Sequence, residues 1–525
     1  MIALTGHKLS IDELWSIACI NSPCSLAEEA RPLLRRSRQF VENLAAQPRA
    51  IYGINTGFGP LSGFRIGPEE LAQHQLNLLH HLTVGQGPLF SEVETRAIMV
   101  ARANALARGY SGIREELLDL LLAAVNHGVL PEIPSEGSVG ASGDLVPLAH
   151  MARLLVGLGN ARVNGQRLPA AEALQKAGLT PAVLQCKEGL ALVNGTSVMT
   201  ALAALSCTEA AQLLRWMELL TACLFQALEG QPEVLCGQAH KARGFRGQSL
   251  VARRISNSLR THPDFARRID EHQWGSHPKP ADAGAEIQDP YSLRCAPQIL
   301  GAFQEAHWHV EQVVTRELNA STDNPLIFAE TEMVIHCGNF YGQQIAMVSD
   351  YQRLGLIKMA LLADRQIERM LNWRLSRGLP PLLAGGPPGL NSGFAGAQLL
   401  ATSLAAEARL LGTAASIQTI PTNANNQDVV SMGCTAAKMT RSALRLLWKL
   451  VAIEALALAQ AADLRRPKEV MGSDYRNLHD AVRSVSPTLS TDRPLVEDIE
   501  RVTALLQSER IQKHCLKDRG ESDED

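Results

Sequence analysis

The stretch GSVGASGDLVPLAH, residues 137–150, places three glycines, two serines and an alanine in the seven positions before Asp144. Within it, Ala141-Ser142-Gly143 is small enough for the Gly143 nitrogen to reach the Ala141 carbonyl carbon, because glycine has no Cβ to obstruct the approach. Attack there and loss of two waters, one from the ring and one from the Ser142 side chain, leave a five-membered ring with an exocyclic methylene. That group is a strong electrophile which no encoded side chain supplies. These residues alone leave a simpler alternative open, a flexible loop that caps the following helix.

The spacing of the other reactive residues excludes several common sites. The glycines of 137–143 follow no strand-like run and precede no lysine, so they form neither a dinucleotide loop nor a P-loop. Ser142 is not the nucleophile of a G-x-S-x-G elbow, because Asp144 takes the last position. His80 and His81 are adjacent, which is the wrong spacing for two ligands on one helix face, and the ten cysteines contain no C-x-x-C pair. We expect no metal site, and reduced, buried thiols.

Eight stretches that follow one another in a fixed order carry a family resemblance. They are YGINTGFG (52–59), GSVGASGDLVPLAH (137–150), ALVNGTS (191–197), DPYSLRCAPQ (289–298), ELNASTDNP (317–325), HCGNFYGQ (336–343), GLNSGF (389–394) and NQDVVSMG (426–433). Together they resemble the aromatic amino acid ammonia-lyases and the related aminomutases, over most of the chain from about residue 10 to 510. The resemblance implies the cofactor 4-methylidene-imidazol-5-one (MIO), which forms autocatalytically from Ala141, Ser142 and Gly143.

The elements that must position these motifs are mainly helical. The segment 434–466 contains no glycine or proline, which predicts one helix of about 45–50 Å whose apolar middle is buried in a bundle. Asn-Gly at 164–165 predicts a tight hairpin. We expect a mainly α protein with a loop-rich N-terminal domain that bears the MIO and a lid loop (1–200), a central up-down bundle of long helices (201–470), and C-terminal helices with an acidic, disordered tail (471–525). The resemblance adds a fumarase/aspartase-like homotetramer with composite active sites.

The overall composition excludes several classes of partner. The 525 residues carry a net charge of −3 and are 46% hydrophobic, which is ordinary for a soluble protein. This balance gives no reason to expect nucleic acid or an anionic membrane. The N-terminus does not resemble a signal peptide, and no window reaches about 18 uninterrupted apolar residues. We therefore expect a cytoplasmic protein, and the resemblance implies a small aromatic amino acid as its partner.

The resemblance assigns catalytic roles to several side chains. Tyr52, on the glycine-rich loop that also holds Gly59, is the expected base for the β-proton. A phenol has a pKa near 10, so its anion must be stabilised to act at neutral pH. Tyr291 is expected near the electrophile or the substrate, and Arg294 is expected to bind the substrate carboxylate bidentately. Taken alone, Tyr52 has a plainer interpretation as a core tyrosine whose hydroxyl has a hydrogen-bond partner.

Five more residues are expected around the cofactor and the pocket. Asn194 is expected to hydrogen-bond the cofactor carbonyl and stabilise negative charge on it, and Phe340 to pack close to the ring. Asp144 is expected to support ring formation and cap the next helix. Asn426 and Gln427 are expected to line the pocket. All of these roles are implied by the resemblance.

Two positions bear on which amino acid binds. His81-Leu82 is similar to tyrosine ammonia-lyases, whereas phenylalanine enzymes typically have Phe-Leu and histidine enzymes Ser-His. A histidine nitrogen can bind a phenol hydroxyl, and such a pocket rejects a ring that lacks the hydroxyl. Gln427 stands where histidine ammonia-lyases carry Glu, which suits an imidazole. Both positions favour L-tyrosine, giving trans-4-coumarate and ammonia; the alternative for His81 is a merely polar loop residue.

Several other functions stay open at this point. A tyrosine 2,3-aminomutase would use the same cofactor and base to give β-tyrosine, and a histidine ammonia-lyase would give urocanate. Gln86 and Tyr341 depart from many relatives and leave room for a ring-hydroxylated tyrosine such as 3,4-dihydroxyphenylalanine. A non-catalytic helical scaffold is opposed by the intact tripeptide 141–143 and by Tyr52.

Overall fold

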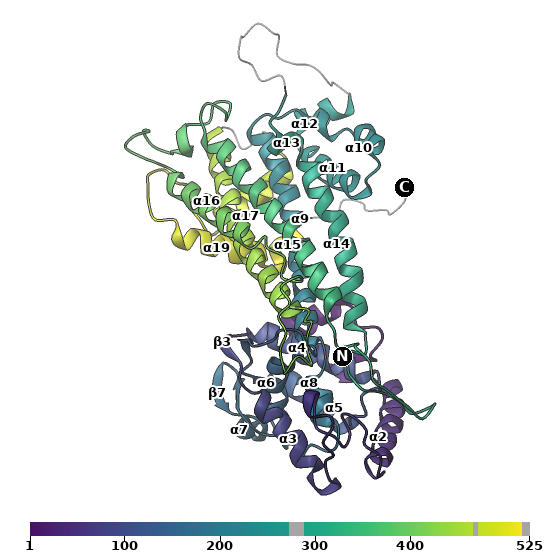
Figure 1. Cartoon of the computed structure of the whole chain (residues 1–525). Helices are drawn as coiled ribbons and strands as arrows, with labels where there is room; N and C mark the ends of the chain where they lie inside the picture. The colour runs from purple at the N-terminus through teal and green to yellow at the C-terminus, as the bar shows by residue number, and fades with distance from the viewer. Residues whose placement is uncertain (272–287, 466–470, 517–525) are drawn as a thin grey trace. The chain divides into compact units, whose positions relative to one another are not determined.

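The computed structural model describes residues 1–271, 288–465 and 471–516. Within these ranges the chain is mainly helical, with a few short strands (Figure 1). This confirms the predicted mainly α class. The acidic tail predicted at the C-terminus lies outside the described residues from 517 onward.

The chain divides into two compact units by its internal contacts. Unit 1 comprises Met1–Thr208, His309–Asp350 and Ala414–Arg441, and unit 2 comprises Glu209–Trp308, Tyr351–Thr413 and Ser442–Asp525. Four long helices have residues in both units: α9 (Ser197–Ala227), α14 (Ala296–Leu318), α15 (Gln343–Leu371) and α17 (Gly433–Arg465).

Unit 1 is built around one buried helix. Its helices are α1 (Ile11–Ile20), α2 (Arg31–Ala45), α3 (Leu71–Leu82), α4 (Glu92–Ala107), α5 (Glu115–Asn126), α6 (Leu145–Leu155), α7 (Ala170–Lys176) and α8 (Glu188–Val193). α4 is buried on every side from Ala97 to Ala107, so it forms the centre of this core. Its start is fixed by a capping box, in which Ser91 and Glu94 each bind the other's backbone N–H. Arg102 on α4 donates to the Asn194 carbonyl at 2.9 Å, so this helix contacts a residue expected beside the electrophile.

The strands of unit 1 are short and tie loops together. β1 (Ile2–Leu4) pairs with β2 (Cys24–Leu26), β3 (Gln86–Leu89) with β5 (Pro134–Glu136), β4 (Leu130–Pro131) and β7 (Gln166–Pro169) with β6 (Asn160–Val163), and β8 (Leu326–Phe328) with β9 (Met333–Ile335). The predicted hairpin at 164–165 is confirmed: Asn164 and Gly165 both have positive φ between β6 and β7. The β3–β5 pair joins the segment after α3 to the segment before the loop 137–143.

Unit 2 is a bundle that contains the larger parts of the long helices. Its other helices are α10 (Gly237–Arg243), α11 (Arg246–Leu259), α12 (Pro263–Asp270), α13 (Tyr291–Arg294), α16 (Ala395–Leu410), α18 (Ser473–Arg483), α19 (Val496–Gln507) and α20 (Glu509–Cys515). α17 runs for 33 residues and is buried on every side from Leu450 to Ala461. The long buried helix predicted for 434–466 is therefore confirmed over its described residues.

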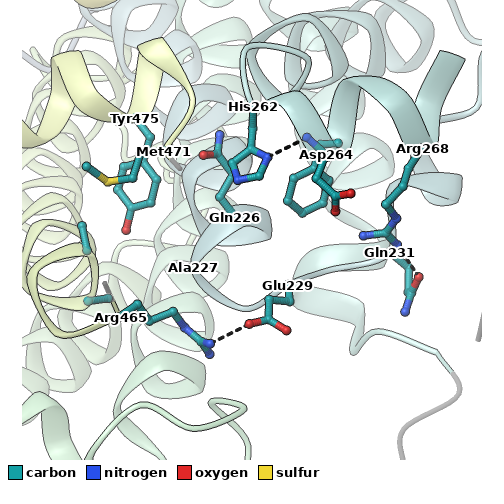
Figure 2. Close-up of a pocket in the computed structure, with 13 residues that line it drawn as sticks. Gln226, Ala227, Glu229, Gln231, His262, Asp264, Arg268, Arg465, Met471 and Tyr475 are labelled. Atoms are coloured by element: carbon teal, nitrogen blue, oxygen red, sulfur yellow. Dashed lines mark hydrogen bonds and ion pairs between the residues drawn. The ribbon is translucent and has the colours of Figure 1, made fainter. Parts of the chain in front are cut away.

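Unit 2 also contains a cavity of about 620 Å³ (Figure 2). Two of its polar side chains have internal partners: Arg465 pairs with Glu229 at 2.9 Å, and the Tyr475 hydroxyl donates to the Leu458 carbonyl at 2.7 Å. None of the residues expected to act in catalysis lines this cavity. The tripeptide 141–143 and Tyr52 lie in unit 1.

Two sequence expectations about the chain as a whole can be compared with the described residues. One helix there, α9, is long and apolar enough to cross a membrane by length and composition, and 78% of its most apolar stretch is buried inside the fold. Such burial is typical of a core helix. All ten cysteines are free thiols, as expected, but only six of them are buried and the other four are half-buried.

Candidate active site

The tripeptide Ala141-Ser142-Gly143 lies in unit 1, directly before α6, with its backbone pressed against Gly195. Gly143 has a φ of +69°, in the left-handed region that favours glycine. A Cβ placed on Gly143 would lie 2.1 Å from the Gly195 carbonyl oxygen. Gly143 therefore lies where a residue with a side chain does not fit.

Replacing Gly143 by alanine should prevent this packing. The new methyl group would collide with backbone at Gly195 and force a left-handed conformation on a residue that disfavours it, a strain of about 1–3 kcal/mol before the collision is counted. We expect a lower melting temperature and a chain that keeps the full mass encoded by its gene. Thermal unfolding and intact mass check both results. Gly178→Ala, which also has positive φ but open space around it, is the matched control for strain without collision.

Asn194 is the side chain in direct contact with the tripeptide. The Ser142 hydroxyl donates to Asn194 Oδ1 at 2.7 Å, and Asn194 is 1% exposed. The Asn194 Nδ2 group donates to Asp323 Oδ1 and to the Asn324 carbonyl, both at 2.9 Å. In the encoded tripeptide, the amide oxygen of Asn194 therefore faces Ser142. The expected donation from Asn194 to the cofactor carbonyl stays a prediction.

Asp144 is fully buried beside the tripeptide, and its carboxylate accepts a hydrogen bond from a different helix from the one we expected. It occupies the N-cap position of α6 but makes no side-chain bond to that helix. Instead it accepts from Met199 N, in the first turn of α9, at 2.9 Å, and from the Ser138 hydroxyl at 2.8 Å. The expected cap on the next helix is therefore wrong, because the carboxylate caps α9. Burial raises the pKa of Asp144 to about 6, and the Met199 N–H opposes this shift.

The N-terminal ends of three long helices meet next to this loop. Met199 lies in the first turn of α9, and its sulfur contacts the starts of the other two helices. A Cβ on Gly342, directly before α15, would lie 2.2 Å from the Met199 sulfur. A Cβ on Gly433, the first residue of α17, would lie 2.4 Å from the same atom. The loop itself is held to the start of α17, since the Ser431 hydroxyl donates to the Gly140 carbonyl at 3.0 Å. Helix N-termini carry partial positive charge, so this region favours negative charge placed beside it.

Tyr52 lies half-buried with its hydroxyl facing the backbone of its own loop. The Gly59 N–H donates to the Tyr52 oxygen at 3.4 Å. The His336 ring meets the Tyr52 ring edge to face, with 5.9 Å between the centroids. Burial raises the pKa of Tyr52, the Gly59 N–H lowers it, and the Asp323 carboxylate raises it again. The phenol is therefore protonated at neutral pH in this structure.

The loop that carries Tyr52 reaches the loop that carries Asn426 and Gln427. A Cβ on Gly59 would lie 2.8 Å from Asn423 Nδ2 and 3.7 Å from Asn426 Oδ1. Gln427 closes its own loop by pairing with Thr422. The structure thus brings together three expected site residues, Gly59, Asn426 and Gln427, beside the proposed base.

His81 and Leu82 form the last turn of α3. Leu82 is half-buried against the core of unit 1, and His81 is exposed. The His81 Nδ1 atom lies 3.1 Å from the Asn77 carbonyl, which can only accept, so Nδ1 must carry the hydrogen in this contact. The neutral ring then presents Nε2 as an acceptor. α3 is fixed relative to the tripeptide's neighbours because Gln75 on α3 accepts from Leu190 N on α8 at 3.1 Å.

The remaining expected residues are Phe340, Tyr291 and Arg294. Phe340 is half-buried in unit 1, three residues before α15. Tyr291 and Arg294 form the ends of α13 in unit 2, where the Arg294 guanidinium lies 4.9 Å from the centre of the Tyr291 ring and Tyr291 is 69% exposed. Their expected contacts with cofactor and substrate stay predictions.

Three buried charged residues near Asn194 were missed in the sequence. Lys187 Nζ donates to Asp323 Oδ2 at 2.6 Å, and Arg102 donates to the carbonyls of Asn194, at 2.9 Å, and Ala191. Burial lowers the pKa of Arg102 to about 10. Asp323 lies inside the quoted stretch 317–325, so its position in a motif was a usable signal; Lys187 and Arg102 lie outside every quoted stretch.

Comparison with known proteins decides the family. The family described as aromatic amino acid lyase matches residues 9–484 of the chain. The chain belongs to this family. Among curated relatives of this lyase, histidine ammonia-lyase from Geobacillus thermodenitrificans is 41% identical, over 97% of this chain and 98% of the relative. The MIO-dependent tyrosine 2,3-aminomutase of Streptomyces globisporus is 38% identical, over 96% of this chain and 94% of the relative.

Solved structures of the family share the fold of this lyase. The tyrosine aminomutase of Streptomyces globisporus matches with a TM-score of 0.91 at 37% identity, covering 98% of each chain. Histidine ammonia-lyase from Trypanosoma cruzi matches with a TM-score of 0.87 at 33% identity, covering 98% of this chain and 94% of the other. The resemblance in the eight stretches is therefore confirmed, and so is the assignment to an enzyme family of lyases and aminomutases.

Proposed function

We propose that this aromatic amino acid lyase removes ammonia from L-tyrosine to give trans-4-coumarate, with an MIO group formed from Ala141, Ser142 and Gly143. The observation that supports it most is the packing of Gly143 on Gly195, which leaves room for no side chain. A residue without a side chain at position 143 is what the attack of its nitrogen on the Ala141 carbonyl carbon requires. The reaction itself is hard because the β-proton is barely acidic and ammonia leaves poorly, so an electrophile that captures the amino group improves the leaving group.

The chain's own residues supply the rest of the proposed chemistry. Tyr52 takes the β-proton, and the Gly59 N–H stabilises the phenolate while it does so. The N-terminal ends of α9, α15 and α17 stabilise negative charge beside the tripeptide. Asn426 and Gln427, which lie near Gly59, line the substrate pocket together with Phe340. The scheme requires no metal.

The preference for tyrosine rests on His81 and Gln427. The Nε2 atom of His81 can accept from the phenol hydroxyl of the substrate, because Nδ1 is engaged by the Asn77 carbonyl. Gln427 is neutral, so it offers no carboxylate to an imidazole or imidazolium ring. A tyrosine ring therefore satisfies the polar groups of this pocket better than a histidine ring.

Replacing His81 by phenylalanine should move the preference from tyrosine toward phenylalanine. The substrate hydroxyl loses its acceptor, and we expect the ratio of kcat/KM for tyrosine over phenylalanine to fall about a hundredfold. Steady-state kinetics on both amino acids measure the ratio. His80→Phe is the matched control, since neighbouring residues on a helix face different directions. An unchanged ratio of kcat/KM in the His81 variant would show that another residue recognises the hydroxyl of the substrate ring.

Two second candidates are favoured by specific comparisons. The curated relatives at about 40% identity include several histidine ammonia-lyases, and one of the relatives with a matching solved structure is a tyrosine aminomutase. By name, these comparisons favour the two alternatives over tyrosine ammonia-lyase, whereas His81 and Gln427 favour a phenol substrate. Histidine elimination would give urocanate; an aminomutase would retain ammonia and re-add it to give β-tyrosine.

Parallel progress curves with identified products separate these candidates. L-tyrosine, L-phenylalanine, L-histidine and L-DOPA are supplied at equal concentration. We expect coumarate and ammonia from tyrosine as the fastest reaction. Urocanate formed faster than coumarate would establish the histidine enzyme, and β-tyrosine as the main early product would establish the aminomutase. Faster turnover of L-DOPA would indicate that Gln86 and Tyr341 enlarge or polarise the pocket.

We further propose that the protein is a cytoplasmic homotetramer in which Tyr291 and Arg294 complete the active site of another subunit. Tyr291 is 69% exposed in the single chain, which leaves it accessible to a partner. α16 presents Leu399 and Leu410, 75% and 82% exposed, and large exposed apolar side chains favour association. The ten free thiols suit a reducing compartment.

A further inference from the structure

The orientation of the Asn194 amide is determined by the groups behind it. Its Nδ2 side faces two oxygens that can only accept, Asp323 Oδ1 and the Asn324 carbonyl, each 2.9 Å away. The atom facing them must therefore be the NH₂ group, because the hydrogen-bond partners of a side-chain amide decide which way it points. As a result Asn194 Oδ1 points to Ser142 and accepts from its hydroxyl at 2.7 Å.

A buried ion pair holds the carboxylate that sets this orientation. Lys187 Nζ donates to Asp323 Oδ2 at 2.6 Å, and the two side chains are 0% and 2% exposed. Asp323 also accepts from its neighbour Asn324 N through Oδ1, at 2.7 Å, so both carboxylate oxygens are engaged. Asp323 is thus rigidly placed, with one oxygen toward Lys187 and the other toward Asn194.

Stability alone does not explain why this ion pair is kept. Replacing a buried ion pair with well-packed apolar residues is often neutral or stabilising, so such a pair is weak evidence of a structural role. Lys187 also adopts a left-handed conformation, with φ of +67° and ψ of −15°, which is strained for a lysine. A costly charge on a strained backbone, linked to Ser142 through Asp323 and Asn194, indicates a functional constraint.

We propose that Asp323, held by Lys187, is a positioning residue that keeps Asn194 Oδ1 directed at the Ser142 hydroxyl for ring formation. The inference rests on the proposed MIO chemistry and deepens it. In that step the Gly143 nitrogen bonds to the Ala141 carbonyl carbon. The Ala141 oxygen leaves as water with the amide hydrogens of Ser142 and Gly143. The Ser142 hydroxyl then leaves as a second water with the hydrogen of its own Cα, and no electrons are gained or lost.

The variant Asp323→Asn tests the orientation because it creates a competition. The side chain at position 323 then has one oxygen, and both Lys187 Nζ and Asn194 Nδ2 require an acceptor. The ammonium is the stronger donor, so the oxygen turns to Lys187 and the new NH₂ faces Asn194. Asn194 then loses its acceptor at position 323 and is no longer held with Oδ1 toward Ser142. Adding Lys187→Met removes the competing donor and lets the amide oxygen at position 323 return to Asn194.

Cell-free synthesis of the full chain, sampled over time by intact mass, gives the rate at which two waters are lost. We expect Asp323→Asn to lose the two waters about ten- to a hundredfold more slowly than the wild type. This is the effect expected when one hydrogen bond to a charged group is lost. The double variant K187M/D323N should recover most of the rate. If Asp323 had a merely structural role, the double variant would mature more slowly than Asp323→Asn, because it lacks one more native side chain.

Glu188→Gln is the matched control, since Glu188 is the next residue, is equally buried and forms its own ion pair with Arg114 at 2.7 Å. It should mature at the wild-type rate. Maturation of Asp323→Asn at the wild-type rate would overturn the inference, and so would a folded double variant no faster than the single one. If Asp323→Asn does not fold, the double variant decides alone: complete maturation supports the inference and incomplete maturation of folded protein overturns it. Failure of the wild type to lose any water would instead refute the proposed function.

Discussion

The Ser142→Ala variant should lose nearly all activity while keeping its fold. Alanine has no hydroxyl to eliminate, so no exocyclic methylene can form and the amino group of the substrate meets no electrophile. We expect kcat to fall by at least about a thousandfold, which corresponds to roughly 4 kcal/mol of transition-state stabilisation. The structural cost is small, because the hydroxyl makes one hydrogen bond, to Asn194 Oδ1, whose loss costs about 1 kcal/mol.

Product formation from tyrosine and thermal unfolding measure the two effects of Ser142→Ala separately. Ser135→Ala, a half-buried serine on β5 in the same connection, is the matched control and should remain active. Near wild-type turnover in the Ser142 variant, with its melting temperature unchanged, would refute the assignment of the electrophile to residues 141–143.

The Tyr52→Phe variant should form the ring normally but remove the β-proton poorly. We expect kcat/KM to fall by about 10²–10⁴, the usual contribution of a general base. Burial raises the pKa of Tyr52, and the active form is the phenolate. The wild-type rate should therefore rise with pH, about tenfold per unit below that pKa. The variant should lose this rise.

Rates of both proteins across neutral and alkaline pH, with intact mass measured in parallel, check the role of Tyr52. Tyr110→Phe serves as the control, because Tyr110 lies in the same unit but packs on Phe328, away from the tripeptide. A Tyr52→Phe protein that keeps the rise of rate with pH would assign the base to another group, and one that fails to lose two waters would give Tyr52 a role in maturation.

The sequence was informative where function depends on local backbone. The need for a residue without a side chain at 143 was readable from Ala-Ser-Gly, and the structure shows the backbone of Gly195 in the space that a side chain would occupy. Asn164-Gly165 predicted its hairpin because two successive left-handed residues suit few other pairs. The absence of glycine and proline predicted the start of α17 to within a residue and its helical course up to Arg465, the last described residue of this segment. These features depend on a few neighbouring residues.

The sequence was uninformative where distant segments meet. Asn194 is held by Asp323, 129 residues away, and Asp323 by Lys187, 136 residues away, and no periodicity or spacing encodes such contacts. The resemblance led us to expect Asp144 to cap the next helix. The structure instead directs its buried carboxylate to Met199 N, 55 residues away, because tertiary packing puts the start of α9 against it.

The intact mass of the purified wild-type chain, before and after sodium borohydride, tests the central claim most directly. The account predicts a polypeptide lighter than its encoded sequence by two waters, in which borohydride modifies the group formed from Ala141, Ser142 and Gly143. A chain that weighs what its gene encodes, and that borohydride leaves unchanged, would contradict it.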